Sequence, residues 1–89
     1  MKESVILTFS GRVQCVGFRY FVKQKADVNS VCGFVENLPD RRVYVEAEGE
    51  SDQLQLFISI CKQGPSHARV ENVDIQYCPL QYFEDFFIK

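Results

Sequence analysis

Tryptophan is absent from this sequence, and histidine, the most common general acid and base, occurs only once. This histidine, His67, lies in GPSHARV, a stretch typical of an exposed loop. We interpret Asp40, Glu46, Glu48 and Glu50 as turn and solvent-face residues. The sequence therefore offers neither a Ser-His-Asp triad nor a strong general base.

Runs of basic residues are also missing. The longest is the pair Arg41-Arg42, and 10 Lys and Arg against 12 Asp and Glu give a formal net charge of −2. A nucleic-acid-binding module normally presents a strongly basic face, so we do not expect a nucleic acid partner. The two arginines are compatible either with a local positive field or with an ordinary solvated turn.

No apolar run is long enough to cross a membrane, which requires about 20 residues. The N-terminal stretch MKESVILTFSGR is interrupted by polar residues and lacks the pattern of a signal peptide. The 89 residues are enough for one hydrophobic core. We therefore expect a single domain over residues 1–89, located in the cytoplasm, with no membrane partner.

The four cysteines, Cys15, Cys32, Cys61 and Cys78, are isolated in the sequence. They form no CxxC pair and have no histidine nearby, so a zinc site is not expected. Disulfides are typical of oxidising compartments, for which nothing here argues. We predict free and mostly buried thiols.

The spacing of apolar residues predicts the order of strands and helices. Alternating apolar residues indicate strands, and apolar residues three or four apart indicate helices. The expected strands are 5–10, 33–38, 43–48, 72–77 and 83–88, and the expected helices are 20–28 and 51–62. This is the βαββαβ order of a ferredoxin-like α+β sandwich, in which two helices cover one face of a mostly antiparallel sheet, with an extra C-terminal strand.

Some local details accompany this prediction. Phe21, Val22 and Val28 would form the buried stripe of the first helix. Ser51 is expected to cap the second helix. Pro39-Asp40 would form the turn of a β-hairpin.

The stretch GRVQCVGFR, residues 11–19, joins the first strand to the first helix. The N–H groups that begin a helix lack intrahelical partners and, with the helix dipole, favour an anion. The backbone from Gln14 to Arg19 is suited to surround a phosphate, and Arg19 would add a charge-assisted contact. Alternatively, the glycines only form a turn and Arg19 is exposed to solvent. The spacing of the glycines matches neither a P-loop nor a dinucleotide-binding fingerprint, so it does not by itself decide for a phosphate site.

Asn37 is a second candidate residue. It falls at the end of a predicted strand, where asparagine is uncommon, directly before Leu38-Pro39-Asp40. Its side chain would either take part in the turn or hold a water molecule beside the first loop.

The stretch GRVQCVGFRYF closely resembles the signature of the acylphosphatase family, G-R-V-Q-G-V-G-F-R. Four further blocks resemble the family in order along nearly the whole chain: GFVENLPD at 33–40, VYVEAEGE at 43–50, GPSHARVENVDI at 64–75 and FEDFFIK at 83–89. The first block is specific, and the combination strengthens the resemblance.

The resemblance implies hydrolysis of the carboxyl-phosphate bond of a small-molecule acyl phosphate to a carboxylate and inorganic phosphate. It implies no metal and no other cofactor, and we expect a monomer. Asn37 would orient the attacking water. The phosphate-binding loop would consist of Gln14, Cys15, Val16, Gly17, Phe18 and Arg19. Nothing in the sequence marks a pocket for the acyl group.

Two departures from the family pattern affect the expected site. Cys15 stands where the signature has glycine, which would cost about 1–3 kcal/mol if the backbone there needs a positive φ. Its thiol would be either reactive, because of Arg19 and the helix start, or inert. The hairpin lacks the glycine that usually follows Asp40. The alternative to an enzyme is therefore a catalytically impaired anion- or partner-binding module on the same fold.

Overall fold

A computed structural model describes residues 1–89. The elements are β1 (Lys2–Arg12), α1 (Phe18–Val28), β2 (Cys32–Asn37), β3 (Val43–Glu50), α2 (Ser51–Gln63), β4 (Arg69–Cys78) and β5 (Phe86–Ile88). The predicted βαββαβ order with an additional C-terminal strand is therefore confirmed.

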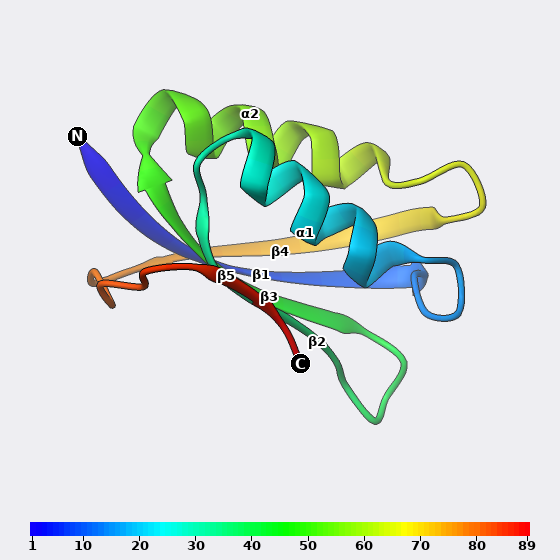
Figure 1. Ribbon diagram of the computed structural model, residues 1–89. Coiled ribbons are helices and arrows are strands. Elements are labelled where there is room, and N and C mark those ends of the chain that lie inside the picture. The colour runs from blue at the N-terminus through cyan, green and yellow to red at the C-terminus, as the bar shows by residue number, and fades with distance from the viewer.

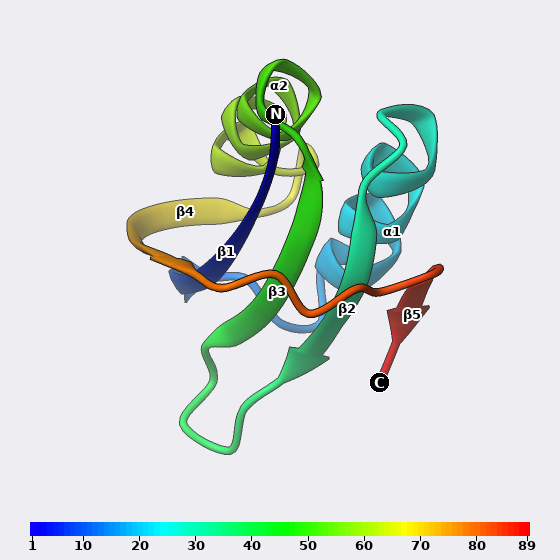
Figure 2. The same ribbon diagram turned by 90° about the vertical axis from the view of Figure 1, so that its left-hand side faces the viewer.

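The five strands form one sheet in the order β4-β1-β3-β2-β5. Antiparallel pairing joins β1 to β3 and β4, and β2 to β3, whereas β2 and β5 are parallel. Both helices cover the same face of this sheet (Figures 1 and 2). The two-layer, mostly antiparallel sandwich predicted from the sequence is confirmed.

The core lies between the sheet and the helices. Every second residue of β1 and β3 is buried there, and Leu7 pairs with Val45 at its centre. The predicted stripe of α2 is also buried: Leu54, Phe57, Ile58 and Cys61. Each fully buried large aliphatic or aromatic side chain stabilises the fold by about 1.5–3 kcal/mol.

The buried face of α1 differs from the prediction. Phe18, Val22 and Ala26 face the core at i, i+4 and i+8, whereas Val28 is 74% exposed. The helix begins at Phe18, which is the first of its buried residues. The buried stripe therefore lies on a face of α1 that is rotated relative to the predicted one. Val31, just after the helix, enters the core instead.

Two predicted ends of elements are also wrong. Ser51 does not cap α2, because Glu50 occupies the N-cap position and Ser51 Oγ donates a hydrogen bond of 2.6 Å to the Met1 carbonyl. The last strand covers only Phe86–Ile88. Phe83 precedes it, and its N–H donates to the Glu48 carboxylate at 3.1 Å.

Glu48 is the acidic residue whose predicted solvent-face position is wrong. It is 1% exposed, and it accepts hydrogen bonds from the N–H groups of Gln81 and Phe83. Because residues alternate along β3, its side chain lies on the sheet face opposite the helices. It therefore holds the connection between β4 and β5 against that face.

The cysteines are free thiols, as predicted, but only one is fully buried. Cys61 lies in the core, Cys32 and Cys78 are partly exposed, and Cys15 is exposed. The prediction of mostly buried thiols is therefore wrong, because the even-numbered strand residues and the loop leave three sulfurs outside the core.

The candidate site forms where several strands end together. Since β1 and β2 run antiparallel to β3, and β1 to β4, the last residues of β1 and β2 lie beside the first residues of β3 and β4. The loop after β1 and the hairpin tip between β2 and β3 consequently share one end of the molecule (Figure 1).

Candidate active site

The loop after β1 begins at a position that requires glycine. The pairing between β1 and β4 shifts register between Ser10 and Gly11, and Gly11 has a φ of 115°. A Cβ atom at Gly11 would lie 2.3 Å from the carbonyl oxygen of Arg69. The absence of a side chain therefore lets β1 stay against β4 up to the start of the loop.

The loop presents unused N–H groups at the start of α1. Cys15 and Gly17 have left-handed φ values of 61° and 76°, and Gly17 is the N-cap of the helix. The backbone N–H groups of residues 14–20 donate no backbone hydrogen bond, the first such donor being Phe21 to the Gly17 carbonyl at 3.0 Å. With no acidic residue in the first turn, this concave set of amides suits an anion.

The Arg19 side chain is oriented by the C-terminus. Its Nη1 donates to the Lys89 carbonyl oxygen at 2.9 Å. Lys89 is itself fixed, because its N–H donates to the Val35 carbonyl of β2 at 2.8 Å. The guanidinium is therefore held in place by β2 and the end of the chain, with its other N–H groups left for a ligand.

Gln14 connects the loop to the hairpin tip. Its Nε2 donates to the carbonyl oxygens of Leu38 at 2.9 Å and Arg42 at 3.0 Å. This side chain fixes the distance between the loop and the end of β2, on which Asn37 lies.

Asn37 and Arg19 line the same pocket. The pocket has a volume of about 100 Å³ and includes five of the six predicted loop residues: Gln14, Cys15, Gly17, Phe18 and Arg19. Val16 does not line it, because its side chain packs against the core. The structure therefore brings together residues from the loop, the helix start and β2, although they are distant in the sequence.

The turn that follows Asn37 is made by another residue. Asp40 Oδ1 accepts the Arg42 N–H at 3.2 Å, and Asp40 Oδ2 pairs with Arg42 Nε at 2.8 Å. The hydrogen bond from the Arg42 backbone lowers the pKa of Asp40 below its usual value. Asp40 therefore forms the predicted turn, and the exposed Asn37 amide is available to a ligand or water.

The sequence profile of the acylphosphatase family matches residues 5–88. The chain belongs to the acylphosphatase family. An acylphosphatase of Thermus thermophilus is 48% identical to it over 73 residues, which are 82% of this chain and 83% of the relative. The resemblance stated from the sequence is confirmed.

Solved acylphosphatase structures share the fold over the full length of the chain. The Bacillus subtilis acylphosphatase is 37% identical, covers 100% of this chain and 99% of its own, and has a TM-score of 0.92. The acylphosphatase of Coxiella burnetii is 32% identical, covers 99% and 93%, and has a TM-score of 0.95.

Three features of this acylphosphatase-family site were not found from the sequence. They are the Lys89 carbonyl that orients Arg19, the Gln14 side chain that holds the hairpin tip, and a second cavity beside the loop. The first two are contacts to backbone carbonyls, which leave no residue-type signal.

Neither helix has the length and apolar content needed to cross a bilayer.

Proposed function

We propose that this chain hydrolyses acyl phosphates in the pocket between the 14–19 loop and Asn37. One observation carries the assignment of roles. The unused loop amides, the oriented Arg19 guanidinium and the exposed Asn37 amide meet in one pocket of a chain that belongs to the acylphosphatase family.

The loop and Arg19 bind the phosphoryl group in this proposal. Backbone N–H groups from Gln14 to Phe18 donate to the phosphoryl oxygens, and Arg19 adds charge-assisted hydrogen bonds. The hydrogen bond to Lys89 restricts the guanidinium before substrate arrives. Preorganised donors of this kind stabilise the charge that spreads over the equatorial oxygens in phosphoryl transfer.

Asn37 positions the water for attack at phosphorus. A bond forms between phosphorus and the water oxygen while the bond between phosphorus and the acyl oxygen breaks. The electron pair leaves with the carboxylate, and a proton of the water passes to a phosphoryl oxygen. Because a carboxylate is a good leaving group, the reaction depends on positioning and electrostatics and needs no strong acid or base.

The alternative of an impaired binding module receives less support. Cys15 has a φ of 61°, so the loop keeps a left-handed backbone at the position where the signature has glycine. The thiol is exposed and its backbone N–H is unused. The cysteine therefore leaves the donors of the loop in place.

Hydrolysis of benzoyl phosphate in ¹⁸O-labelled water tests this function. Attack at phosphorus places the label in inorganic phosphate. Label in benzoate would show attack at the acyl carbon and would overturn the mechanism, and no release above the uncatalysed rate would overturn the function. A monomeric state, a cytoplasmic location and independence of metals remain predictions.

A further inference from the structure

A second cavity adjoins the proposed phosphate pocket. It has a volume of about 600 Å³ and shares three lining residues with that pocket: Val13, Gln14 and Cys15. Gly11 and two arginines, Arg12 and Arg41, complete its lining. An acyl group attached to a phosphoryl group in the loop must leave the smaller pocket, and this cavity begins at the same three residues.

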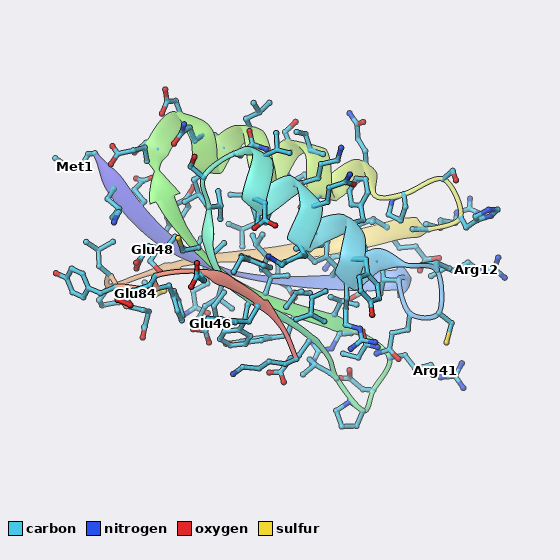
Figure 3. All side chains as sticks on the ribbon, viewed as in Figure 1. Met1, Arg12, Arg41, Glu46, Glu48 and Glu84 are labelled. Atoms are coloured by element: carbon cyan, nitrogen blue, oxygen red, sulfur yellow. The ribbon has the colours of Figure 1, made fainter.

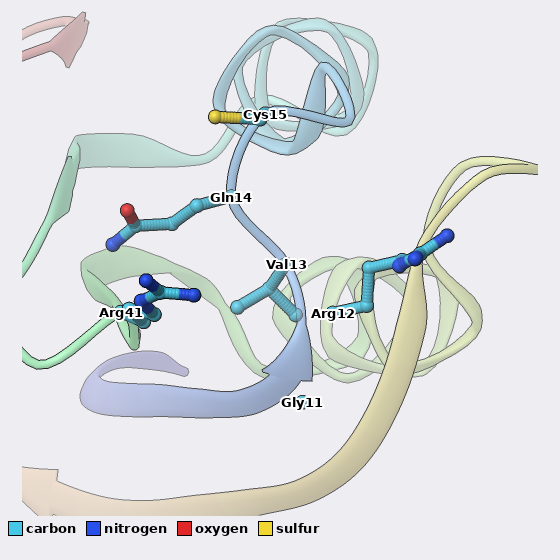
Figure 4. A pocket seen from close by; sticks show the side chains of 6 residues that line it. All are labelled: Gly11, Arg12, Val13, Gln14, Cys15 and Arg41. Carbon is cyan, nitrogen blue, oxygen red and sulfur yellow. The ribbon is translucent and has the colours of Figure 1, made fainter.

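Arg41 approaches the cavity from the hairpin tip. In Figure 4 its guanidinium lies beside the Gln14 side chain and is turned toward Val13, whereas Arg12 extends on the other side of the loop. Arg41 forms no ion pair, because the neighbouring Asp40 carboxylate is engaged by Arg42 at 2.8 Å. Its charge is therefore available to an anion.

The backbone holds Arg41 at this place. Gln14 Nε2 donates to the carbonyls of Leu38 and Arg42, which flank the residue on both sides. Arg41 also has a left-handed φ of 76°, a conformation that favours glycine. A charged side chain thus stands, at some cost in backbone energy, where glycine would fit more easily.

The surrounding charges favour an anion as well. Arg69 lies opposite Arg12 in the pairing of β1 with β4, and Glu71 lies next to Gly11 on that side. The five arginines of the chain lie at the ends of elements, or in the turn between β2 and β3, that meet here: Arg12, Arg19, Arg41, Arg42 and Arg69. The positive field is therefore concentrated here although the net charge of the chain is −2.

We propose that Arg41 forms a subsite for a second negative charge on the acyl group, and that Arg12, on the other side of the loop, adds only to the positive field. The preferred substrates are then acyl phosphates whose acyl part carries a carboxylate or phosphate. This rests on the proposed hydrolysis of acyl phosphates at the adjoining pocket. A guanidinium pairs well with either anion, so the subsite selects by charge and distance and not by a closed shape.

The test compares 4-carboxybenzoyl phosphate with benzoyl phosphate, which lacks the second charge, and the effect of Arg41→Gln on their ratio isolates the contribution of that charge. The unaltered chain should show a kcat/KM about two- to fivefold higher for the carboxylated substrate, as expected for one partly exposed ion pair. Arg41→Gln should bring the ratio of the two kcat/KM values to about one, and Arg12→Gln should reduce it less. Arg69→Gln, which removes a charge from the same end but not from the cavity lining, should keep it.

Several outcomes would overturn the subsite. These are no preference in the unaltered chain, a preference that survives Arg41→Gln, or a preference that Arg69→Gln abolishes equally, which would indicate only a general field. Arg41→Gly serves as a second variant, because glycine accepts the left-handed backbone and removes the charge without strain.

A binding measurement separates this proposal from the hydrolytic function. Calorimetric titration with 4-carboxybenzylphosphonate and benzylphosphonate, which are not hydrolysed, should show the same two- to fivefold preference, about 0.4–1 kcal/mol, and its loss in Arg41→Gln. If neither benzoyl phosphate is turned over, the hydrolytic function fails and the phosphonate pair still decides the subsite. Equal affinity for the two phosphonates would refute it.

Discussion

Cys15 reports on the backbone shape of the proposed phosphate-binding loop. Its left-handed φ of 61° is the conformation that the family signature accommodates with glycine. The sequence shows that cysteine stands where the family signature has glycine. It does not show that the position needs a positive φ, because that depends on the turn formed by Gly17 and the start of α1. The same turn leaves the thiol exposed beside Arg19 in the site.

Replacing Cys15 by glycine should preserve or raise stability. The left-handed backbone costs a residue with a Cβ about 1–2 kcal/mol, and the extra freedom of glycine in the unfolded chain offsets about 0.5–1 kcal/mol of the gain. Urea unfolding should show Cys15→Gly up to about 1 kcal/mol more stable than Cys15→Ala, which keeps the Cβ. A glycine variant that is clearly less stable would contradict this backbone account.

The thiols should differ sharply in reactivity. Cys15 is exposed, whereas burial raises the pKa of Cys61 to about 12 and keeps it protonated and shielded. Iodoacetamide should therefore modify Cys15 first, inorganic phosphate should slow this phase, and Cys15→Ala should remove it. Modification that phosphate does not slow would mean that Cys15 lies outside the phosphate site.

Among the elements, the connection between β4 and β5 depends on one buried side chain. The Glu48 carboxylate accepts the N–H groups of Gln81 and Phe83. This connection leads to β5, and Lys89, directly after β5, orients Arg19 through its carbonyl oxygen. The buried Glu48 carboxylate therefore helps to fix the position of Arg19, because it holds the segment that leads to β5 and Lys89.

Removing the Glu48 carboxylate should destabilise the fold. Glu48→Ala leaves two N–H groups without their charged acceptor, so we expect a loss of about 2–3 kcal/mol in the free energy of unfolding. Glu36→Ala, on β2 and partly exposed, should cost much less. Equal losses in the two variants, measured by thermal or urea unfolding, would show that the hydrogen bonds to Gln81 and Phe83 contribute little.

The elements illustrate what local patterns predict and what they do not. The alternation of Val5, Leu7 and Phe9 predicts a strand with one buried face, which the structure shows. The helix starts at Phe18, directly after Gly17, the last glycine of the loop. Glu48 was misjudged because its partners, Gln81 and Phe83, are distant in the sequence and contribute backbone groups. For the same reason the family-like blocks at 11–19 and 33–40 indicated Arg19 and Asn37, but no sequence block indicated the Lys89 carbonyl or the cavity beside Arg41.

At the scale of the whole molecule, charge is unevenly distributed. Figure 3 shows Arg12 and Arg41 at one end and Met1, Glu48 and Glu84 toward the other. The arginine-rich end contains the proposed site, so we expect an anionic substrate to be attracted to it despite a net charge of −2.

Salt should weaken this attraction. Between about 0.01 and 0.1 M salt the Debye length falls from about 30 Å to about 10 Å. We therefore expect kcat/KM for benzoyl phosphate to fall several-fold over this range, mainly through KM, and less steeply in Arg69→Gln. A kcat/KM independent of salt, or an identical slope in Arg69→Gln, would argue against steering by this end of the molecule.

The most direct test of the central claim is phosphate release from benzoyl phosphate in the presence of EDTA. It compares the unaltered chain with Arg19→Ala and Asn37→Ala, and uses Arg69→Ala as a charge control. We predict rapid release that survives the chelator and Arg69→Ala, and a loss of at least about 100-fold in kcat/KM in each of the other two variants. Release at the same rate in Arg19→Ala or Asn37→Ala would contradict the proposed roles of these residues.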